Sequence, residues 1–321
     1  MASFNPAGFH ALTPGNEVVA AYSERVAART FLVTGASPTS IGCTTATFLA
    51  GAKPAAIILV ARSASKLAET TAAVTAIDSN VYVLPVVIDL SSMASVRQGA
   101  ETILSDARIS SIDVVINNAA IMAGPYEKSP DGIELQFATC HIGHFLLTLL
   151  LAPKLRASAE GGRVVNVSSS GHRKVNFTGV ADYDPLFEYK SYEQWDGYGN
   201  AKLANILFTK GLVARGFQSY SLHPGSVYSS LGTRINNDFE SATKAFHNVP
   251  DMEDFQPFKT LQEGPNTQLV AALRPASEIP NGSYYFQCQI GEPSALARDE
   301  SGELTKKLWD ISEKVVGQKF D

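Results

Sequence analysis

The chain has 321 residues, of which 45% are apolar and 18% charged, and its 26 basic and 31 acidic side chains give a formal net charge of −5. This composition is typical of a globular protein with a large buried core and excludes collagen-like, coiled-coil and wholly disordered chains. No run reaches the ~18 apolar residues of a membrane span, and the acidic balance gives no basic footprint for nucleic acid.

The cysteines and the N-terminal segment indicate the compartment and the domain plan. Cys43, Cys140 and Cys288 are odd in number and widely spaced, so they predict neither a disulfide framework nor a metal-ligand set. The first thirty residues lack the basic start and apolar segment of a secretory signal. We expect a cytoplasmic protein without a metal, with a leader segment at 1–29 packed on a single domain formed by 30–321.

Apolar runs and helical segments alternate along the chain. Strands are predicted at 31–33, 56–60, 81–88 (interrupted at Pro85), 112–116, 162–167, 218–222 and 284–286. Helices are predicted at 17–22, 43–52, 65–77, 93–105, 132–151, 198–215, 260–273 and 303–316. Because the strands are apolar throughout and separated by helices, the fold class is α/β: a Rossmann-type doubly wound parallel sheet in three αβα layers.

Two long polar stretches, 172–197 and 228–257, interrupt this alternation, and both follow the carboxyl ends of predicted strands. Open α/β sheets bind their ligands at these ends, and loops of this length are uncommon unless they are functional or disordered. We therefore expect a small substrate lid formed by these loops and the C-terminal helices. The alternative is that their aromatic residues cover local hydrophobic patches; these residues are Tyr183, Phe187, Tyr189, Tyr192, Trp195, Phe239, Phe246 and Phe255.

The first strand leads into the small-residue turn TGASPTSIG at 34–42. Such a turn lets the backbone approach a pyrophosphate at a helix N-terminus, although a tight structural turn gives the same pattern. After the second strand, Arg62 and Lys66 stand where a carboxylate would bind ribose hydroxyls, and this favours the 2′-phosphate of NADP over NAD. The alternative is a solvated helix start with both side chains in water.

The third and fourth strands end in further polar residues. Asp89 can place a carboxylate near an adenine amine, but an Asp before two serines is equally a helix cap. Asn117 and Asn118 can bond the backbone of neighbouring strands and order a cleft, or simply make a turn.

A serine-rich strand end at 168–170 and a Tyr-x-x-x-Lys segment carry the strongest chemical signal. Tyr198 and Lys202 are four residues apart on a predicted helix and therefore project on one face. An ammonium beside a phenol favours the phenolate and lowers the tyrosine pKa. A serine hydroxyl from the strand end is placed to bind a carbonyl oxygen while the tyrosine protonates it and a nicotinamide delivers hydride.

Together these motifs resemble the short-chain dehydrogenase/reductase family over nearly the whole chain, from about residue 17 to residue 320. Within the family the chain is similar to the retinol-dehydrogenase-like branch, including fungal members with Ser-Pro in the nucleotide loop. The resemblance rests on the segments TGASPTSIG, NNAA, CHIGHFLLT, VVNVSSSGH, YGNAKLANILFT and HPGSV. Family members often form dimers or tetramers through the helices after strands four and five, and here both a monomer and a homodimer remain open.

The resemblance implies that Ser169 orients the substrate, that Tyr198 is the acid/base, and that Lys202 holds the ribose and lowers the tyrosine pKa. The implied cofactor contacts are Gly35, Ser37, Ser40, Ile41 and Gly42 at the pyrophosphate, Arg62 and Lys66 at the 2′-phosphate, Asp89, Leu90, Asn118, Ala119 and Ala120 on the adenosine side, Tyr198 and Lys202 beside the ribose, and Pro224, Gly225 and Val227 at the nicotinamide.

The chain departs from the family pattern in three places. Its nucleotide loop is one residue longer, with Ser40 at the usual middle glycine, and Ala120 replaces the last glycine of Asn-Asn-Ala-Gly. Cys140 stands at the asparagine whose backbone carbonyl normally holds a water beside the lysine. For His141 and His144 we favour helix packing or a subunit contact, and for His172 a hinge role is as plausible as substrate contact.

The sequence therefore predicts an NADP(H)-dependent oxidoreductase that interconverts a ketone or aldehyde with an alcohol on a hydrophobic small molecule. The predicted version is a ketone reductase of secondary-metabolite, polyketide-like biosynthesis. The alternative is a non-redox protein on the same scaffold, either a cyclase, isomerase or dehydratase or a ligand-binding regulator, because a chain released from hydride transfer is free to drift at Ser40, Ala120 and Cys140. A structural interaction module is a third class.

Overall fold

The computed structural model describes residues 8–177, 179–188, 191–235, 244, 246, 249 and 257–320. Their centre is an eight-stranded sheet with the order β3-β2-β1-β4-β5-β6-β7-β8. The strands are β1 Thr30–Thr34, β2 Ala56–Ala61, β3 Tyr82–Val87, β4 Val114–Asn117, β5 Arg163–Val167, β6 Gln218–His223, β7 Tyr284–Phe286 and β8 Gln289–Gly291. All neighbours pair in parallel except β8, which runs antiparallel to β7.

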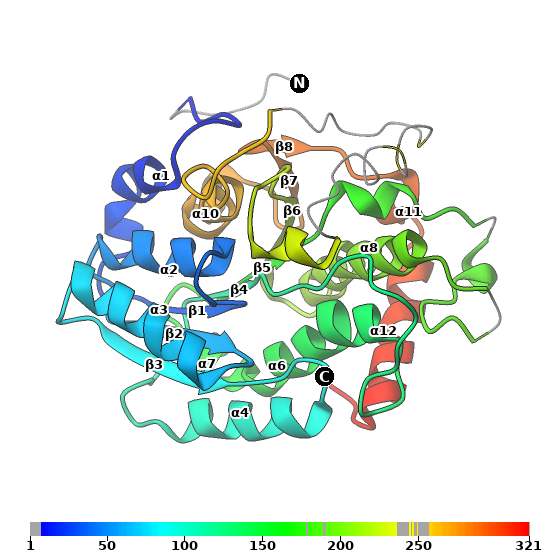
Figure 1. Cartoon of the computed structure of the whole chain (residues 1–321), viewed down its shortest axis with the longest axis horizontal. Helices are drawn as coiled ribbons and strands as arrows, with labels where there is room; N and C mark the ends of the chain where they lie inside the picture. Colours follow the sequence, from blue (N-terminus) through cyan, green and yellow to red (C-terminus); the bar gives the residue numbers. More distant parts are fainter. Residues whose placement is uncertain are drawn as a thin grey trace.

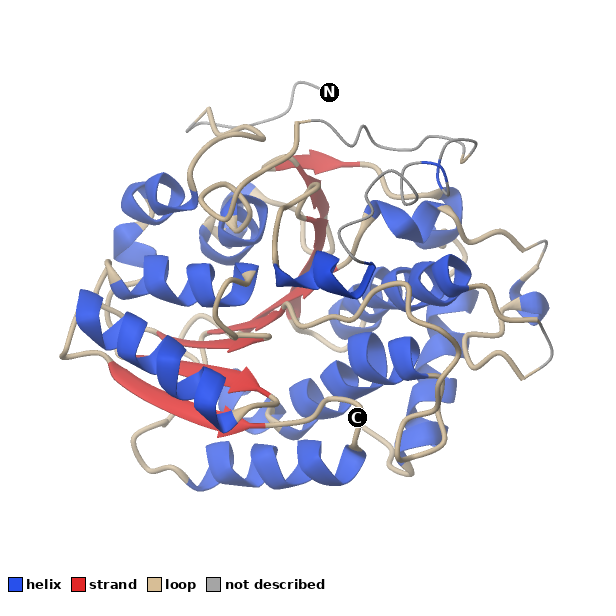
Figure 2. Cartoon of the chain, in the orientation of Figure 1, coloured by secondary structure: helices blue, strands red, loops and turns tan. Residues whose placement is uncertain are grey.

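Helices cover both faces of this sheet, which gives the three layers seen in Figures 1 and 2. The α-helices are α1 Gly15–Ala21, α2 Ile41–Ala50, α3 Ala64–Ile77, α4 Met93–Ser105, α5 Leu135–Phe137, α6 Gly143–Leu150, α7 Ala152–Arg156, α8 Gln194–Val213, α10 Asn266–Leu273, α11 Ala295–Arg298 and α12 Glu303–Val316. One core joins the sheet to α4, α6, α8 and α12, and the other joins it to α1, α2, α3 and α10. The predicted doubly wound α/β fold is confirmed.

Strands β1, β2, β4 and β5 are buried along their whole length because helices lie on both of their sides. The predicted interruption at Pro85 is wrong: β3 is continuous, and Pro85 pairs with Leu59 of β2. A proline is tolerated there because β3 is the edge strand, so its missing N–H faces no neighbour. The strand order reverses between β1 and β4, which places a crevice at the carboxyl ends of these strands.

The predicted long helix at 132–151 is helical without a break from 135 to 150, so it begins three residues later than predicted. It consists of α5, a π-helical turn at Ala138–Ile142, and α6. A π-turn widens a helix locally and is frequent at functional sites. Helix α8 begins four residues before the predicted start, because the Glu193 carboxylate accepts hydrogen bonds from the N–H groups of Trp195 and Asp196.

The described part of the N-terminal segment packs on the domain. Helix α1 contacts α2 and α10. The Asn266 side chain donates to the carbonyls of Ala11 and Thr13 at 2.8 and 2.9 Å. Among the described residues, no helix has both the length and the apolar character needed to cross a bilayer.

The two long stretches differ in how they contact the rest of the protein. In the first, Tyr183 is buried in the core with α12, and Lys307 of α12 donates to the carbonyls of Val180 and Ala181. Trp195 instead packs against Phe246 of the second stretch, with ring centroids 5.2 Å apart. Tyr189, Phe239 and Phe255 lie outside the described residues.

Candidate active site

The turn between β1 and α2 is built for close approach of the backbone. Gly35 has φ +72°, and an added Cβ would lie 2.8 Å from the Cα of Ala119. At Gly42 an added Cβ would lie 2.6 Å from the Gly35 carbonyl oxygen. Ser40 is the N-cap of α2: its hydroxyl accepts from the N–H of Cys43 at 3.1 Å and lies 2.8 Å from the Gly35 carbonyl. The Ser40 hydroxyl therefore links the two ends of the longer nucleotide loop, the Gly35 carbonyl and the first turn of α2.

The ends of β1 and β4 are joined by side-chain hydrogen bonds. Asn118 donates to the Thr34 carbonyl at 2.8 Å, and the Thr34 hydroxyl accepts from the backbone N–H groups of Asn118 and Ala119 at 2.9 Å. Asn117 donates to the Asn166 side chain of β5 at 2.9 Å. These bonds agree with the prediction that the asparagines order the cleft.

A cavity at these strand ends, here called the Arg62 cavity, gathers most of the predicted cofactor residues. It is lined by Gly35, Ser37, Ser40, Ile41, Val60, Ala61, Arg62, Lys66, Ile88, Leu90, Asn118, Ala119, Ala120, Ile121, Thr139, Ser229, Ser230 and Leu231. Arg62 and Lys66 are the charged residues among these described lining residues. Asp89 does not line it: its carboxylate accepts from the N–H and hydroxyl of Ser91 at 3.0 and 2.7 Å, which forms a local turn. The helix-cap alternative is wrong, because the N-cap of α4 is Ser92.

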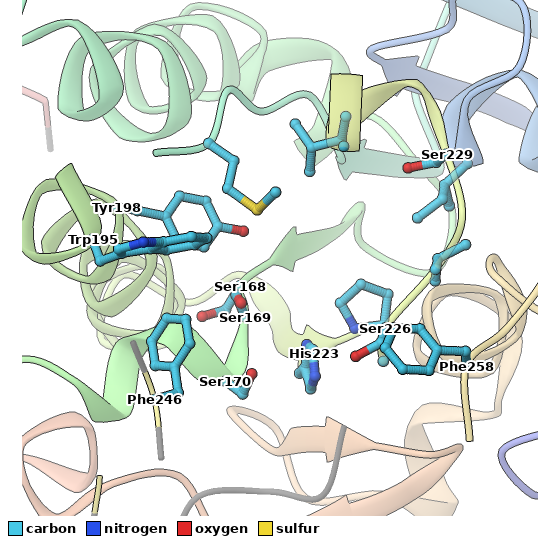
Figure 3. Close-up of a pocket in the computed structure, with 17 residues that line it drawn as sticks. Ser168, Ser169, Ser170, Trp195, Tyr198, His223, Ser226, Ser229, Phe246 and Phe258 are labelled. Carbon is cyan, nitrogen blue, oxygen red and sulfur yellow. The ribbon is translucent and has the colours of Figure 1, made fainter. Parts of the chain in front are cut away.

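A neighbouring cavity, here called the Tyr198 cavity, lies beyond β5 and β6 and is shown in Figure 3. It is lined by Ile41, Met122, Ser168, Ser169, Ser170, Trp195, Tyr198, His223, Pro224, Gly225, Ser226, Val227, Ser229, Leu231, Gly232, Phe246 and Phe258. Ile41, Ser229 and Leu231 line both cavities, so these two hollows meet at one boundary. The predicted nicotinamide residues Pro224, Gly225 and Val227 lie beside the predicted catalytic pair Ser169 and Tyr198.

The Ser169 hydroxyl and the Tyr198 phenol face the same space in Figure 3. Ser169 accepts from the Gly171 N–H at 3.1 Å, which leaves its own proton to donate. Burial raises the pKa of Tyr198, and the Ser169 hydroxyl opposes this rise. The predicted fall in the tyrosine pKa is therefore not what this arrangement produces.

Lys202 lies one turn beyond Tyr198 on α8 and is 1% exposed. Its ammonium donates to the Val167 carbonyl at 2.8 Å and lies 5.7 Å from the centre of the Tyr198 ring. Burial lowers the pKa of Lys202. Lys202 lines neither cavity. It lies behind Tyr198 as seen from the Tyr198 cavity.

Cys140 sits in the π-helical turn, and its thiol donates to the Ile121 carbonyl at 3.5 Å. Its backbone carbonyl lies 3.0 Å from Nδ1 of His144, and Nε2 of His144 lies 2.8 Å from the Thr34 hydroxyl. A carbonyl only accepts, so Nδ1 carries the proton and Nε2 accepts from Thr34. The imidazole thus connects the predicted relay carbonyl to the β1 strand end; burial lowers the pKa of His144 to about 4 and keeps it neutral.

The other two histidines singled out by sequence also have defined partners. His141 lies among Phe137, Phe145 and Phe208, and its Nε2 is 2.7 Å from the Ser312 hydroxyl of α12, which agrees with the predicted packing role. His172 donates from Nδ1 to the Ser169 carbonyl at 2.6 Å and accepts from the Ser294 N–H at 3.0 Å. His172 therefore connects the backbone at Ser169 to the backbone at Ser294 and helps to fix the position of Ser169.

Sequence reasoning missed several residues that line the cavities. Ser229 and Leu231 lie past the predicted nicotinamide segment, while Met122 and Phe258 come from segments with no motif. His223 also lines the Tyr198 cavity, and in the sequence it is only the first residue of HPGSV, with no pattern that marks a cavity residue. Among the described residues, no group of three or more His, Cys, Asp or Glu side chains is arranged to hold a metal ion.

Comparisons with known proteins agree with this geometry. The family model of short chain dehydrogenases matches residues 29–184. Retinol dehydrogenase 11 of Mus musculus is 36% identical over 294 residues, which are 90% of this chain and 87% of that protein. A solved structure of an uncharacterized protein from Mycobacterium paratuberculosis has a TM-score of 0.67 and 30% identity, covering 92% of this chain and 96% of the other.

A second solved structure has the same fold at lower identity. It is described as an NAD(P) dependent gluconate 5-dehydrogenase from Beutenbergia cavernae with bound NADP, and it aligns with a TM-score of 0.60 at 22% identity over 80% of this chain and 94% of its own. The family model, the retinol dehydrogenase relative and the doubly wound sheet together show that this chain belongs to the short-chain dehydrogenase/reductase family of nicotinamide-dependent oxidoreductases, in its retinol-dehydrogenase-like branch.

Proposed function

We infer that this protein is an NADP(H)-dependent oxidoreductase that interconverts a ketone or aldehyde with an alcohol on a hydrophobic small molecule, acting as a ketone reductase on polyketide-like compounds. The observation that carries the proposal is that Ser169 and Tyr198 share one largely apolar cavity, which adjoins the Arg62 cavity. A carbonyl compound bound there would contact a hydroxyl donor and a phenol, next to the cavity that gathers most of the predicted cofactor residues.

The residues present fit a dinucleotide. The turn at Gly35 and Gly42 leaves no room for a Cβ and keeps the backbone of the β1–α2 loop at the cavity wall. The start of α2 faces this space, so its free N–H groups suit a pyrophosphate. Gly35, Ser37, Ser40, Ile41, Asn118, Ala119, Ala120 and Leu90 would hold the adenosine and pyrophosphate portion, and Pro224, Gly225, Val227 and Ser229 the nicotinamide portion.

The NADP preference rests on charge. Arg62 and Lys66 are exposed at the edge of the Arg62 cavity, and its described lining contains no carboxylate. A carboxylate at this place would repel a 2′-phosphate, whereas a guanidinium binds it with charge-assisted hydrogen bonds. NADPH is therefore the proposed reductant.

In the proposed reaction the bound cofactor supplies the hydride. Ser169 donates a hydrogen bond to the substrate carbonyl oxygen and fixes its position. Tyr198 donates its phenolic proton to the same oxygen as charge develops there. Lys202, held by the Val167 carbonyl, would contact the ribose hydroxyls and supply a positive charge behind the phenol. The apolar walls formed by Met122, Trp195 and Phe246 exclude water from the reacting carbon.

The proposed direction is carbonyl reduction. Burial raises the pKa of Tyr198, so the phenol keeps its proton at neutral pH and can donate it to a carbonyl oxygen. An enzyme accelerates both directions of a reversible reaction, so the proposed direction rests on the largely reduced NADP pool of the cytosol and not on the tyrosine.

We also propose a cytoplasmic monomer that folds as one unit. In the family, dimers form through the helices after strands four and five, and here α12 packs against α8. Trp309 of α12 contacts Phe145 of α6 at 5.0 Å between ring centroids, and the Arg215 guanidinium lies 3.4 Å from the centre of the Trp309 ring. Light scattering after size exclusion should give the monomer mass of 34.3 kDa; twice that mass contradicts the proposal.

The proposed function is tested by following NADPH and NADH consumption with a panel of aromatic and alicyclic ketones and aldehydes. We expect turnover with NADPH, weaker turnover with NADH, and turnover about 100- to 10,000-fold slower with Tyr198→Phe. Calorimetric titration with each cofactor runs in parallel. If neither cofactor binds, hydride transfer is excluded and the non-redox alternative replaces it.

A further inference from the structure

Three polar side chains at one side of the Tyr198 cavity have no part in the proposed chemistry. Ser170, His223 and Ser226 line the cavity and form what is here called the polar floor, below Ser168 and Ser169 in Figure 3. His223 is 6% exposed and Ser170 3%. Within the described part of the chain, none of the three side chains makes a hydrogen bond. His223 and Ser170 are buried and Ser226 is half-buried. Buried polar side chains normally have partners, so His223 and Ser170 without any, beside a third hydroxyl, indicate a ligand.

The ring of His223 is held in a fixed orientation. It stacks on Phe286 with centroids 5.3 Å apart and planes 8° from parallel. Its Nδ1 is fully enclosed and has no partner among the described residues, whereas Nε2 is not enclosed in this way. Burial and the nearby cations Lys259 and Lys202 lower the pKa of His223, so the imidazole is neutral.

A neutral imidazole carries one proton, and its position follows from these contacts. An N–H buried without an acceptor loses a hydrogen bond to water and regains none. The proton therefore resides on Nε2, and His223 presents a donor to the cavity, next to two serine hydroxyls that donate or accept.

We propose that the polar floor binds a second oxygen atom of the substrate, so that the preferred substrate is an apolar ketone or aldehyde that also carries a hydroxyl or another carbonyl group. This rests on the proposed function, because the first oxygen is the one held by Ser169 and Tyr198. An oxygen on the far side of the same molecule would accept from Nε2 of His223 and bond to Ser170 or Ser226.

The consequence is selectivity among carbonyl compounds. A substrate with a single terminal oxygen and an otherwise apolar body, as in a retinoid, covers the polar floor with carbon and leaves its donors without partners. A site built to bond a substrate hydroxyl discriminates against the analogue that lacks it. For a partly enclosed floor we expect a preference of about 10- to 100-fold.

The test uses one carbon skeleton with and without the second oxygen: tetralone and its monohydroxylated isomers. Calorimetry measures their binding to Tyr198→Phe loaded with NADPH, in which turnover should be too slow to disturb the titration. We expect at least one hydroxy isomer to bind about 10- to 100-fold more tightly than tetralone. Adding His223→Leu should bring this ratio close to one, and adding His223→Gln, which keeps an N–H donor, should restore much of it.

Two results overturn the inference: no isomer binds more tightly than tetralone, or the ratio survives His223→Leu. Retention of tetralone and NADPH binding by His223→Leu shows that the variant folds and that the lost contact is specific. Turnover of the same compounds by the unsubstituted enzyme is measured separately. Selective binding that depends on His223, together with the absence of any NADPH oxidation, rejects the proposed reductase function and leaves the polar floor in place.

Discussion

The two cavities of this protein differ in the kinds of residue that line them and in where these residues lie in the sequence. The Arg62 cavity lies at the ends of β1, β2 and β4, where small residues such as Gly35, Ala119 and Ala120 line part of it, and hydrogen bonds from Thr34, Ser40 and Asn118 fix the shape of these strand ends. The Tyr198 cavity is walled by large side chains from distant segments, such as Met122, Trp195 and Phe246. Backbone geometry repeats between proteins with the same turn, whereas side-chain walls vary with every substitution.

This difference separates what the protein binds from what it acts upon. The first cavity suits a cofactor that many enzymes share, and its small residues leave little freedom for change. The second combines apolar walls, a catalytic pair and a polar floor, and each of these parts is set by a few side chains. Substitutions in the first cavity should therefore change cofactor affinity, and substitutions in the second should change catalysis or substrate choice.

The largest expected effect is in the Tyr198 cavity. Tyr198→Phe removes the proton donor and keeps the ring, so kcat should fall about 100- to 10,000-fold, the usual contribution of general acid catalysis. The dissociation constant for NADPH should change less than about threefold, because the phenol lies outside the Arg62 cavity. Single-turnover kinetics and calorimetry measure the two quantities. An equal loss in both would mean that the two cavities do not act separately.

The fold itself was largely readable from the sequence. Strands buried on both faces are apolar throughout, so β1, β2, β4 and β5 are visible as short runs, and the C-terminal helix Glu303–Val316 has the predicted bounds. Strand β8 was missed because it has three residues and pairs only with β7. The π-turn at Ala138–Ile142 leaves no composition signal, since it changes hydrogen bonding within an apolar helix.

The cofactor half of the site was also predictable in outline, because turn residues such as Gly35 and Gly42 are chosen by local geometry. The walls of the Tyr198 cavity were not. Phe258 and Met122 reach it through tertiary packing, and no local pattern marks an apolar residue as a cavity wall rather than core. The partners of His144 and His172 were equally hidden, because hydrogen bonds between residues far apart in sequence carry no spacing rule.

Acid pH should weaken the histidine connections on which both cavities rely. Burial lowers the pKa of His144 to about 4 and that of His172 to about 3. Both pKa values lie below the ordinary histidine value of ~6.5. Below pH ~6.5 these histidines therefore become protonated in the unfolded chain but stay neutral in the folded chain, which favours unfolding. The contribution of each neutral histidine to the free energy of unfolding is fully present above about pH 6.5. It declines as the pH falls, by roughly 2 kcal/mol per histidine at pH 5.

Urea unfolding at pH 7.5, 6 and 5 measures this effect. His144→Gln removes one of the titrating groups, so its stability should be lower at pH 7.5 but should decline less steeply toward pH 5. His10 is exposed and serves as the control, because His10→Gln should leave the slope unchanged. A stability that is constant between pH 7.5 and 5 contradicts the assignment of neutral, buried imidazoles.

Arg62→Ala should have the opposite effect to Tyr198→Phe: it should change cofactor affinity and leave catalysis nearly unchanged. Removing the guanidinium should weaken NADPH binding about 10- to 100-fold, the range of one charge-assisted contact, and leave NADH binding and kcat nearly unchanged. Lys66→Ala should act in the same way but less strongly, because an ammonium binds a phosphate without a bidentate fork. Lys128→Ala changes the net charge equally at an exposed place outside both cavities and is the matched control. Equal weakening of NADPH and NADH would place the guanidinium elsewhere than at a 2′-phosphate.

The smallest effect concerns Ser40, the residue that departs from the family glycine. Its hydroxyl caps α2 by accepting from Cys43 and lies within hydrogen-bond distance of the Gly35 carbonyl, so Ser40→Ala should cost about 1 kcal/mol of unfolding free energy. Ser40→Gly should cost only a few tenths, because a glycine at an N-cap leaves the N–H groups open to water. Thermal unfolding with and without NADPH measures both variants. If the serine acts only within the loop, the two variants differ in stability and bind NADPH as tightly as the unsubstituted protein. A loss of NADPH affinity in both variants would mean that the hydroxyl itself contacts the phosphates. The Arg62 cavity would then depend on a side chain, as the Tyr198 cavity does.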